Sequence, residues 1–376
     1  MLNPGKFFRL FSTRFIMNKK RIVIGFFGFS VAIIFSLQAY QNMVVTVPLI
    51  DLRGSPIAAP QDIKAPALSE DIGSELSQLF MGECLRTQDE GLGDFVKVEA
   101  IEQDIWANGA WIPCPGYVNK NHVKMVEKFP AVNAVVVQPL AAVVDEKNSG
   151  VVQAQVPFGT CLLVEQQAGD QLLVNVGDVC KGQVRKDAVY VVTPQVTESI
   201  GQLRIASVQR ALLFLGSFYV WGGRSMYDPA YALCITGLDC SNLIHLIFRS
   251  LGLKIPRNSQ SQYVKSLPVA SGQDLKAGDV IYLSPARAER MCHVLIYIGN
   301  EMFIETTGLG FTSAKQTDKP EELTTRMVSA QDYFGKTVAQ LTNGLEVNNN
   351  KKIYLRTFFG NAEYVQALRD DFFKRD

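Results

Sequence analysis

The sequence has almost no net charge and lacks the residue spacings that usually hold metal ions. Its 376 residues include 37 Lys and Arg against 36 Asp and Glu, a balance that gives no electrostatic case for nucleic acid as a partner. No Cys-x-x-Cys or His-x-x-x-His spacing occurs, so we expect neither a metal site nor a cofactor. The chain is long enough to form two or three domains with a sizeable core.

One uncharged run stands out near the start of the chain. Basic residues between positions 6 and 21 precede the run 22–37, which carries no charge, and this order is typical of an export signal. A buried core helix is the alternative. The run is slightly shorter than the roughly 20 residues of a comfortable membrane span, so a cleaved signal and a retained inner-membrane anchor both stay open for residues 1–40. No Cys follows it directly, which excludes a lipoprotein anchor. We expect an exported protein of the periplasm or cell envelope, either free or anchored by residues 22–39.

The next two segments differ in their proline content and periodicity. Residues 41–68 carry four prolines and few periodic apolar positions, which predicts a linker. Residues 69–195 show short alternating runs separated by glycines, which predicts β-strands.

This β region contains an internal repeat. Each copy has Gly-x-Cys, then a polar turn, then Gly-Asp before an alternating strand, and later a Cys-x-Gly-x-Val-x-Lys segment. The aligned pairs are Leu79–Val98 with Val156–Val176, and Cys114–Val126 with Cys180–Val192. The repeat predicts two small β-barrels, at 69–128 and 129–195, with one larger β-sandwich as the alternative. The Gly-x-Val-x-Lys ending resembles that of bacterial SH3-like barrels.

Four of the seven cysteines occupy equivalent positions in the two copies. Cys84 aligns with Cys161, and Cys114 aligns with Cys180. Two equivalent positions in each copy predict one disulfide per barrel, Cys84–Cys114 and Cys161–Cys180, which an exported chain allows chemically. The alternative is four buried apolar cysteines, because a free Cys packs like a small hydrophobic residue.

From Glu198 the sequence changes to helical periodicity and longer strands. Apolar residues recur at helical spacing up to Gly216, which is placed as a C-terminal cap. Further predicted elements are a helix after Cys240, strands at 279–284, 293–299, 302–307 and 351–359, and a helix from Ala362. The pattern predicts an α+β domain over 196–376, in which a helix lies beside an antiparallel sheet.

Cys240 is the best candidate for a reactive thiol. Apolar residues at 243–251 predict a helix, and Asp239 is an N-cap residue type immediately before it. Cys240 then falls in the first turn, where unpaired N–H groups and the helix dipole favour a thiolate. Of the remaining cysteines, Cys234 lies in a loop and Cys292 begins a strand; a bridge between them would leave Cys240 free.

A reactive thiol needs a base, and the sequence offers three histidines. We interpret His245, on the same helix as Cys240, as a packed core residue, and His122 as an ordinary residue of the first barrel. His293 opens an alternating strand and is the predicted base. Glu305 lies on the next strand, where a turn would bring it beside His293, and is predicted to orient the imidazole. A solvated strand-edge carboxylate is the alternative for Glu305.

Several segments in this order resemble the NlpC-type cell-wall cysteine peptidases, which have a papain-like fold. The resemblance covers roughly residues 200–306. The matching segments are YVWGG (219–223), LDCSNL (238–243), IPRNSQSQ (255–262), LKAGDVIYL (275–283), HVLIYIGN (293–300) and FIET (303–306). The order of domains, with SH3-like barrels before the peptidase domain, resembles that of the family members that cleave the γ-D-glutamyl–diamino acid bond of peptidoglycan stem peptides.

The resemblance implies roles for individual residues. Cys240 would be the nucleophile, His293 the base and Glu305 the orienting group. Tyr219 and the Cys240 backbone N–H would stabilise the oxyanion, and Trp221 in the same segment would contact the substrate. Asp239 and Ser241 would hold a free amine of the substrate, with the first barrel closing one end of the cleft. The implied partners are peptidoglycan stem peptides or muropeptides.

This chain departs from the family pattern at three places. Glu305 stands where the family often has His, and Asn242 stands where Gly usually follows Asp-Cys-Ser. The third departure is the loop 224–236, which is longer than expected. Residues 308–350, which follow the matching segments, look like an insertion. Two other functions therefore remain open: an inactive protein that binds wall peptides, and an amidase or acyltransferase on the same scaffold.

Overall fold

The computed structural model describes residues 39–375, apart from 57–74, 90, 149, 228, 230–235, 289, 308–323 and 348–349. The expected export segment at 22–37 and the loop cysteine Cys234 therefore lie outside the described residues. Within the described residues, no helix is long and apolar enough to span a membrane.

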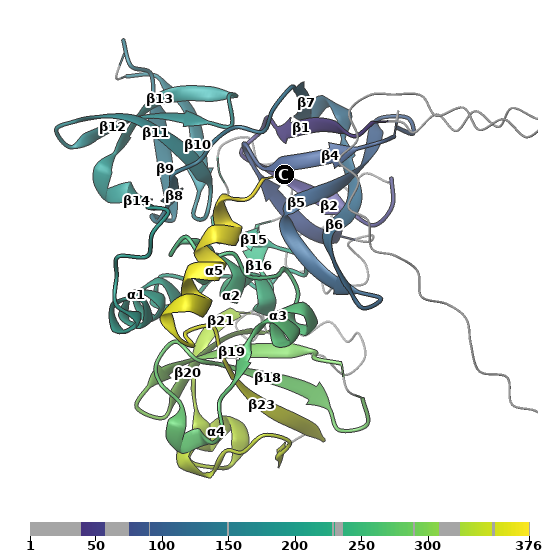
Figure 1. Ribbon diagram of the computed structural model, residues 1–376, viewed down its shortest axis with the longest axis vertical. Coiled ribbons are helices and arrows are strands. Elements are labelled where there is room, and N and C mark those ends of the chain that lie inside the picture. Colours follow the sequence, from purple (N-terminus) through teal and green to yellow (C-terminus); the bar gives the residue numbers. More distant parts are fainter. Residues whose placement is uncertain are drawn as a thin grey trace, which may run out of the picture. The chain divides into compact units, whose positions relative to one another are not determined.

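Two β units precede a unit of helices and sheet (Figure 1). The first β unit has strands β1 (Gln41–Val45), β2 (Leu49–Arg53), β3 (Glu75–Phe80), β4 (Cys84–Thr87), β5 (Phe95–Ala107), β6 (Ala110–Asn119) and β7 (Val123–Val126). The second has β8 (Ala134–Val136), β9 (Leu140–Val144), β10 (Val152–Pro157), β11 (Cys161–Ala168), β12 (Gln171–Val176), β13 (Cys180–Arg185) and β14 (Val189–Val191).

The two β units share one strand order. The first sheet runs β3-β2-β6-β5-β4-β1-β7 and the second runs β10-β9-β13-β12-β11-β8-β14, so each strand has a counterpart seven places later. Each unit also has its own apolar core. The sequence repeat thus corresponds to two sheets of the same topology, although its first two strands lie upstream of the predicted boundary.

Part of the predicted linker is therefore not a linker. Residues 41–45 and 49–53 form β1 and β2, the counterparts of β8 and β9. Their apolar side chains, such as Val45 and Leu52, are fully buried in the core of the first β unit. Of the prolines that suggested a linker, Pro48 lies between these strands and Pro56 lies after β2, where a missing N–H group costs no ladder hydrogen bond.

The third unit is α+β. Its helices are α1 (Ile200–Leu212), α2 (Cys240–Arg249), α3 (Ser259–Lys265), α4 (Ala330–Phe334) and α5 (Ala362–Phe373). Its strands are β15 (Arg224–Ser225), β16 (Gly237–Leu238), β17 (Leu267–Pro268), β18 (Val280–Pro285), β19 (His293–Gly299), β20 (Met302–Thr307), β21 (Thr324–Ser329), β22 (Glu346–Val347) and β23 (Lys351–Thr357). The main sheet is antiparallel, in the order β17-β23-β18-β19-β20-β21, with β22 beside β23.

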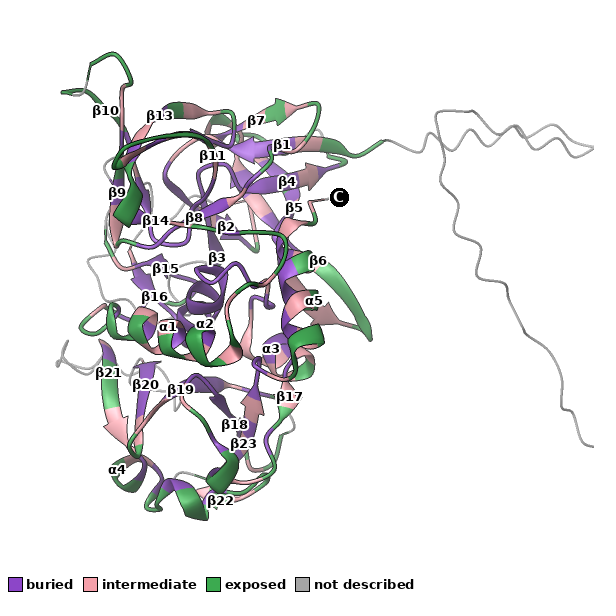
Figure 2. Cartoon of the chain, turned by 60° about the vertical axis from the view of Figure 1, so that its left-hand side comes forward, coloured by how far each residue is buried: buried purple, intermediate pink, exposed green. Residues whose placement is uncertain are grey.

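Helix α2 is the centre of the third unit. All ten of its residues are buried, and it lies against β19 and β20, whereas α1 exposes one face (Figure 2). The core around α2 continues into both β units, because Phe80 of the first and Phe158 of the second belong to the same apolar cluster as Leu246. Each such phenylalanine contributes roughly 1.5–3 kcal/mol of burial free energy. The β units therefore help to hold the helix that carries Cys240.

Close backbone contact joins the two β units. A methyl group on Gly177 would lie 2.2 Å from the Gly82 Cα, and both glycines have positive φ, +61° and +80°. Gly159, the repeat counterpart of Gly82, instead lies against Leu246 of α2. The repeated Gly-x-Cys segment is thus used twice to place a β unit against a neighbouring part of the chain.

The predicted disulfides are wrong, because Cys84, Cys114, Cys161 and Cys180 are all free thiols. The alternation of side chains along a strand explains why the two cysteines of each predicted pair lie apart. Leu85 and Cys114 point into the core of the first β unit, so Cys84, next to Leu85, points out of it. In the second unit, Cys180 packs on the inner core, whereas Cys161 belongs to a different apolar cluster. The alternative reading, buried apolar cysteines, describes three of the four; Cys180 is half-buried.

Cys84 and Cys161 both face a buried charge cluster between the units. Arg249 at the end of α2 contacts Glu83 at 3.1 Å and Glu102 at 2.6 Å. Other members of this cluster are Arg224, which contacts Glu83 at 3.0 Å, and Arg375, which contacts Glu102 at 3.1 Å and the Cys84 sulfur at 3.2 Å. Burial raises the pKa of Cys84 to about 12, so this thiol is neutral inside the cluster.

Candidate active site

The N-terminus of α2 is fixed by the side chain that precedes Cys240. Asp239 has extended backbone angles, and its carboxylate accepts hydrogen bonds from the Asn242 N–H at 2.7 Å and the Ser241 hydroxyl at 2.9 Å. This is an N-cap arrangement, as the sequence predicted from an Asp before an apolar helical run. It places Cys240 in the first turn, where helical N–H groups have no partner within the helix.

Cys240 lies against the start of β19. Its side chain is buried, and the N–H of Val294, the residue after His293, donates a hydrogen bond to its sulfur. Burial and the Asp239 carboxylate nevertheless raise the pKa of Cys240 well above its usual value, although Val294 and Arg257 lower it. The expected thiolate-favouring environment is therefore outweighed by burial, so the thiol is neutral until a base accepts its proton.

His293 and Glu305 are in direct contact. The Nε2 atom of His293 lies 2.7 Å from Oε2 of Glu305, and both side chains are almost completely buried. The pairing of β19 with β20 brings the two strands together as expected. Glu305 is therefore not a solvated edge carboxylate. Because Nε2 faces Glu305, Nδ1 is the nitrogen of His293 left for proton transfer.

Glu305 has two further partners that sequence reasoning missed. Arg326 on β21 donates from Nε and Nη2 to Oε1 of Glu305, at 3.1 and 3.0 Å. Tyr333 on α4 forms a side-chain hydrogen bond to the same carboxylate. Burial raises the pKa of Glu305, but His293, Tyr333 and Arg326 together hold it below its usual value. The carboxyl group is therefore an anion.

Two aromatic residues of the YVWGG segment have different surroundings. Tyr219 is buried, and its pKa is raised first by burial and then by Cys240 and Asp239, which places it near the nucleophile. Trp221 is 41% exposed. Asn242 fixes the segment through two hydrogen bonds. Its Nδ2 donates to the carbonyl oxygens of Gly222 at 3.0 Å and Gly223 at 2.8 Å. The bulkier residue at this departure from the family pattern thus anchors the loop.

Asp239 is occupied by a cation of its own chain. Arg257 donates from Nη2 to Asp239 Oδ2 at 2.6 Å and from Nη1 to the Ser241 hydroxyl at 2.9 Å. Arg257 also reaches the first β unit through the Ser77 hydroxyl at 2.8 Å. Arg257 lies in the matching segment 255–262, but its role could not be predicted from the sequence. It neutralises the cap residue and ties the nucleophile's turn to the first β unit.

Glu75 of the first β unit lies beside this turn. A methyl group on Gly222 would lie 2.8 Å from Glu75 Oε1, and the Gly222 N–H donates to Asp239 at 3.1 Å. Glu75 is 2% exposed, and neither carboxylate oxygen has a hydrogen-bond partner among the described residues. Burial first, and then Asp51, raise the pKa of Glu75 well above its usual value. An unsatisfied buried carboxylate is costly unless it meets a cation.

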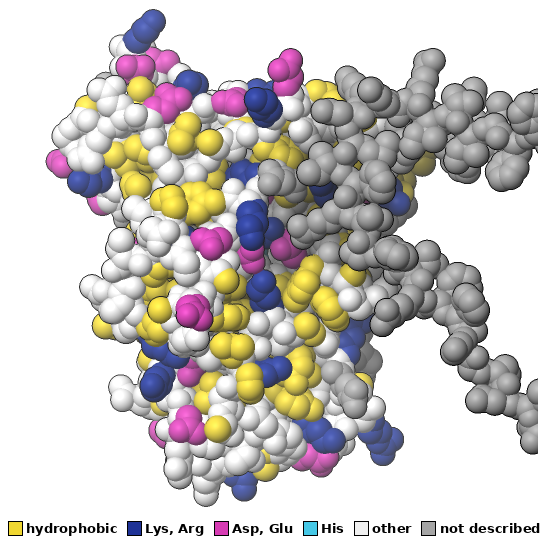
Figure 3. Space-filling model, viewed as in Figure 1, with side chains coloured by type: hydrophobic (Ala, Val, Ile, Leu, Met, Phe, Trp, Pro, Cys, Tyr) yellow, Lys and Arg dark blue, Asp and Glu magenta, His cyan; other side chains and the backbone are white. Residues whose placement is uncertain are grey.

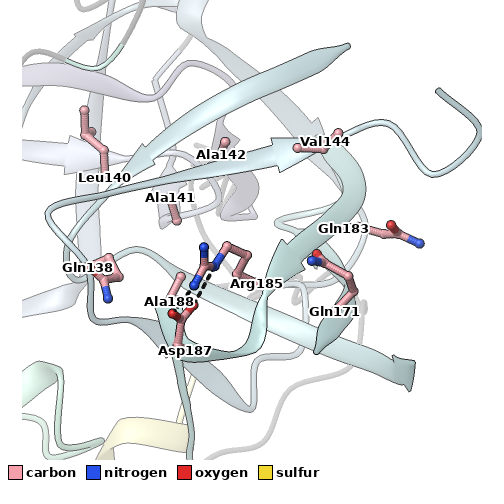
Figure 4. Close-up of a pocket in the computed structure, with 10 residues that line it drawn as sticks. All are labelled: Gln138, Leu140, Ala141, Ala142, Val144, Gln171, Gln183, Arg185, Asp187 and Ala188. Carbon is pink, nitrogen blue, oxygen red and sulfur yellow. Dashed lines mark hydrogen bonds and ion pairs between the residues drawn. The ribbon is translucent and has the colours of Figure 1, made fainter. Parts of the chain in front are cut away.

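The remaining histidines and a surface hollow lie outside this arrangement. His245 is buried in α2, where burial and Arg224 lower its pKa well below the usual value, as fits a packed neutral residue. His122 lies in the short 3₁₀ turn after β6. A hollow on the second β unit is lined by Arg185 and Asp187, which pair with each other, and by uncharged residues (Figure 4). It contains no nucleophile–base pair among its lining residues.

Charged side chains of the described residues gather in no large patch of one sign on the face that Figure 3 shows. On the face shown in Figure 3, acidic and basic side chains of the described residues are interspersed. This agrees with the balanced composition.

The part of the chain that contains Cys240 is similar to known proteins. Residues 216–329 match the NlpC/P60 family model. The peptidoglycan endopeptidase RipA of Mycobacterium tuberculosis is 33% identical over 107 residues, which are 27% of this chain and 22% of the relative. RipB of the same species is 33% identical over 105 residues, which are 27% of this chain and 42% of the relative. A gamma-DL-glutamyl hydrolase of Bacillus subtilis is 33% identical over 118 residues, which are 29% of this chain and 26% of the relative.

A solved structure extends the likeness beyond that segment. An NlpC/P60 family protein from Bacillus cereus aligns with a TM-score of 0.62, over 85% of this chain and all of that chain, at 18% identity. At this identity the likeness concerns the fold alone. The chain covers between 22% and 42% of the length of the three curated relatives. Residues 216–329 of this chain are therefore similar to the domain that the NlpC/P60 family model describes.

Proposed function

We propose that this chain is an exported cysteine endopeptidase that cleaves the γ-D-glutamyl–diamino acid bond of peptidoglycan stem peptides. The observation that carries the proposal is the arrangement around α2. There, Cys240 at the helix start receives a hydrogen bond from the residue after His293, and His293 is held by Glu305. The curated relatives named as peptidoglycan endopeptidases and as a gamma-DL-glutamyl hydrolase support this substrate class. Export rests on the basic and apolar segments before residue 38.

The proposed reaction begins with proton transfer. His293 Nδ1 accepts the Cys240 proton, and Glu305 stabilises the resulting imidazolium through Nε2. The sulfur then attacks the γ-carbonyl carbon of the D-glutamyl residue. The developing oxyanion accepts hydrogen bonds from the Cys240 N–H and the Tyr219 hydroxyl.

The second half of the reaction releases both products. The imidazolium gives its proton to the departing amine, and a thioester remains on Cys240. His293 then removes a proton from water, whose oxygen attacks the thioester carbonyl. The carboxylic acid leaves and the thiol is restored. The raised pKa of Cys240 is consistent with a nucleophile that is ionised by its base during turnover.

We further propose that the substrate presents a free amine to the first β unit. Asp239 and Ser241 were the predicted amine ligands, but Arg257 already neutralises Asp239. Glu75 adds a second carboxylate beside the same turn, with no hydrogen-bond partner among the described residues. An ammonium bound there would offset the burial cost of Glu75. The β units, which resemble SH3-like barrels in sequence, would thus select stem peptides whose first residue is unblocked.

Defined muropeptides test the proposed function. The wild-type chain should release the diamino acid-containing product, and Cys240→Ala should abolish this release while thermal unfolding stays unchanged. Cys180→Ala removes a half-buried thiol of the second β unit and serves as the matched control. Equal cleavage by wild type and Cys240→Ala would rule out the thiol mechanism, and binding without cleavage by wild type would favour a wall-peptide-binding protein instead.

A further inference from the structure

The carboxylate that orients His293 is held from the side opposite His293. Glu305 and Arg326 are directly paired across β20 and β21. Arg326 places two N–H groups on Oε1, at 3.1 and 3.0 Å, while Oε2 faces His293 at 2.7 Å. Tyr333 adds a hydrogen bond from α4. The charged or titratable side chains around Glu305 are those of His293, Arg326 and Tyr333. They come from three elements, β19, β21 and α4.

We infer that Arg326 and Tyr333 are positioning residues for the catalytic pair: they hold Glu305 as an anion with one oxygen committed to His293. The inference rests on the proposed function. It gives a role to residues 324–334, which sequence analysis placed within an insertion. Tyr333 lies beyond the residues matched by the family model, which end at 329.

The protonation state of Glu305 decides which nitrogen of His293 is the base. An ionised Glu305 accepts the Nε2–H, so Nδ1 carries no hydrogen and is the nitrogen that can accept the Cys240 proton. A protonated Glu305 would instead donate to Nε2, and Nδ1 would carry the hydrogen and be unable to act as a base. Glu305 is completely buried, and burial favours the neutral acid. A permanent cation on the other oxygen opposes this effect.

The geometry favours arginine over lysine at position 326. The Arg326 side chain is 45% exposed, whereas Glu305 is 0% exposed. Its guanidinium therefore extends from the surface into the buried site and donates two hydrogen bonds in a fixed fork, which an ammonium cannot reproduce. Tyr333 restrains the same carboxylate from α4. The centroid of its ring lies 4.9 Å from the ring centroid of Phe334. The carboxylate is thus restrained in rotation as well as in charge.

Steady-state kinetics on defined muropeptides test the inference with Arg326→Gln, Arg326→Lys and Tyr333→Phe. Arg326→Gln should lower kcat about 10- to 100-fold, a part of the roughly 10⁴-fold cost of losing an orienting carboxylate function in a serine-protease triad. KM should change less than about two-fold, because neither residue is proposed to touch substrate. Arg326→Lys should recover part of kcat, and Tyr333→Phe should show a smaller loss.

The pH profile separates positioning from a structural role. Without Arg326 the pKa of Glu305 should rise, so the acid limb of kcat/KM should move to higher pH. The matched control is Arg185→Gln, which removes an equivalent Arg–carboxylate fork from the surface of the second β unit. It should leave both kcat and the acid limb unchanged.

A double-mutant cycle gives the decisive comparison. If Arg326 acts through Glu305, Arg326→Gln should cause little further loss in a Glu305→Gln background. A full and independent loss there, or an unchanged kcat and pH profile in the single variant, overturns the inference. The rate at which iodoacetamide alkylates Cys240, followed by mass spectrometry, needs no substrate. If wild type cleaves no muropeptide, the proposed function fails, and an alkylation rate lowered by Arg326→Gln but not by Arg185→Gln still supports the inference.

Discussion

Replacing Arg249 by Met should destabilise the protein strongly and in a pH-dependent way. Arg249 is buried and holds three groups at once: Glu83 at 3.1 Å, Glu102 at 2.6 Å and the Gly159 carbonyl oxygen at 2.7 Å. Removing one partner from a buried ion network leaves uncompensated charge, which costs about 3–5 kcal/mol. The loss of stability should affect all three units, because Arg249 lies on α2 and its partners come from both β units.

The pKa of Glu102 sets the pH range of this effect. It is about 2, below the ordinary 4.5, because Arg375 and Arg249 outweigh the burial that would raise it. A difference of this size corresponds to about 3 kcal/mol of stability. Because the folded pKa is depressed, the contribution is present above about pH 4.5 and is lost as pH falls toward about 2. The gap between wild type and Arg249→Met should therefore be largest at neutral pH and narrow in acid.

Urea unfolding followed by tryptophan fluorescence measures both features. The free energies of unfolding of wild type and Arg249→Met are compared at about pH 7 and about pH 3.5. Arg185→Met, which breaks an exposed ion pair, should give no measurable change at either pH. A loss below about 1 kcal/mol at neutral pH, or a gap that does not change with pH, would refute the argument from the buried cluster.

Three other substitutions test separate parts of the structure. Gly177→Ala would place a methyl group 2.2 Å from the Gly82 Cα and should cost about 1–3 kcal/mol in urea unfolding; Gly169→Ala has a similar φ of +59° but open space, and should cost clearly less. An equal cost would show that the contact between the β units is unimportant. Asn242→Gly should lower kcat by loosening the loop that its Nδ2 anchors, and unchanged kinetics would contradict that role. Glu75→Gln should reduce the preference of the enzyme for free-amine over N-acetylated stem peptides; a preference that stays the same would exclude Glu75 as an amine ligand.

Local patterns predicted the elements that carry the candidate site. Asp239 before an apolar run placed the helix start, and strand alternation placed His293 at the beginning of β19. These features depend on neighbouring residues, so they can be found in the sequence. The same holds for His245, whose apolar neighbours in the sequence favoured a packed role and which is buried in the structure.

Contacts between distant segments were not predictable in this way. Arg326 meets Glu305 through the register of β20 and β21, which are separated by residues 308–323. Arg257 donates to the Ser77 hydroxyl across 180 positions of sequence. The disulfide prediction failed for a related reason, because the repeat shows which cysteines are equivalent but not the sheet face to which each points. The start of the first β unit was missed because its prolines interrupt the alternation.

Product analysis by mass spectrometry shows which bond is cleaved and whether cleavage requires Cys240. A defined stem peptide with a free N-terminal amine is incubated with wild type, Cys240→Ala and the control Cys180→Ala. We expect cleavage of the γ-D-glutamyl–diamino acid bond by wild type and Cys180→Ala, and a loss of activity of about 10⁴-fold or more in Cys240→Ala. Cleavage of the same bond by Cys240→Ala at the wild-type rate would contradict it.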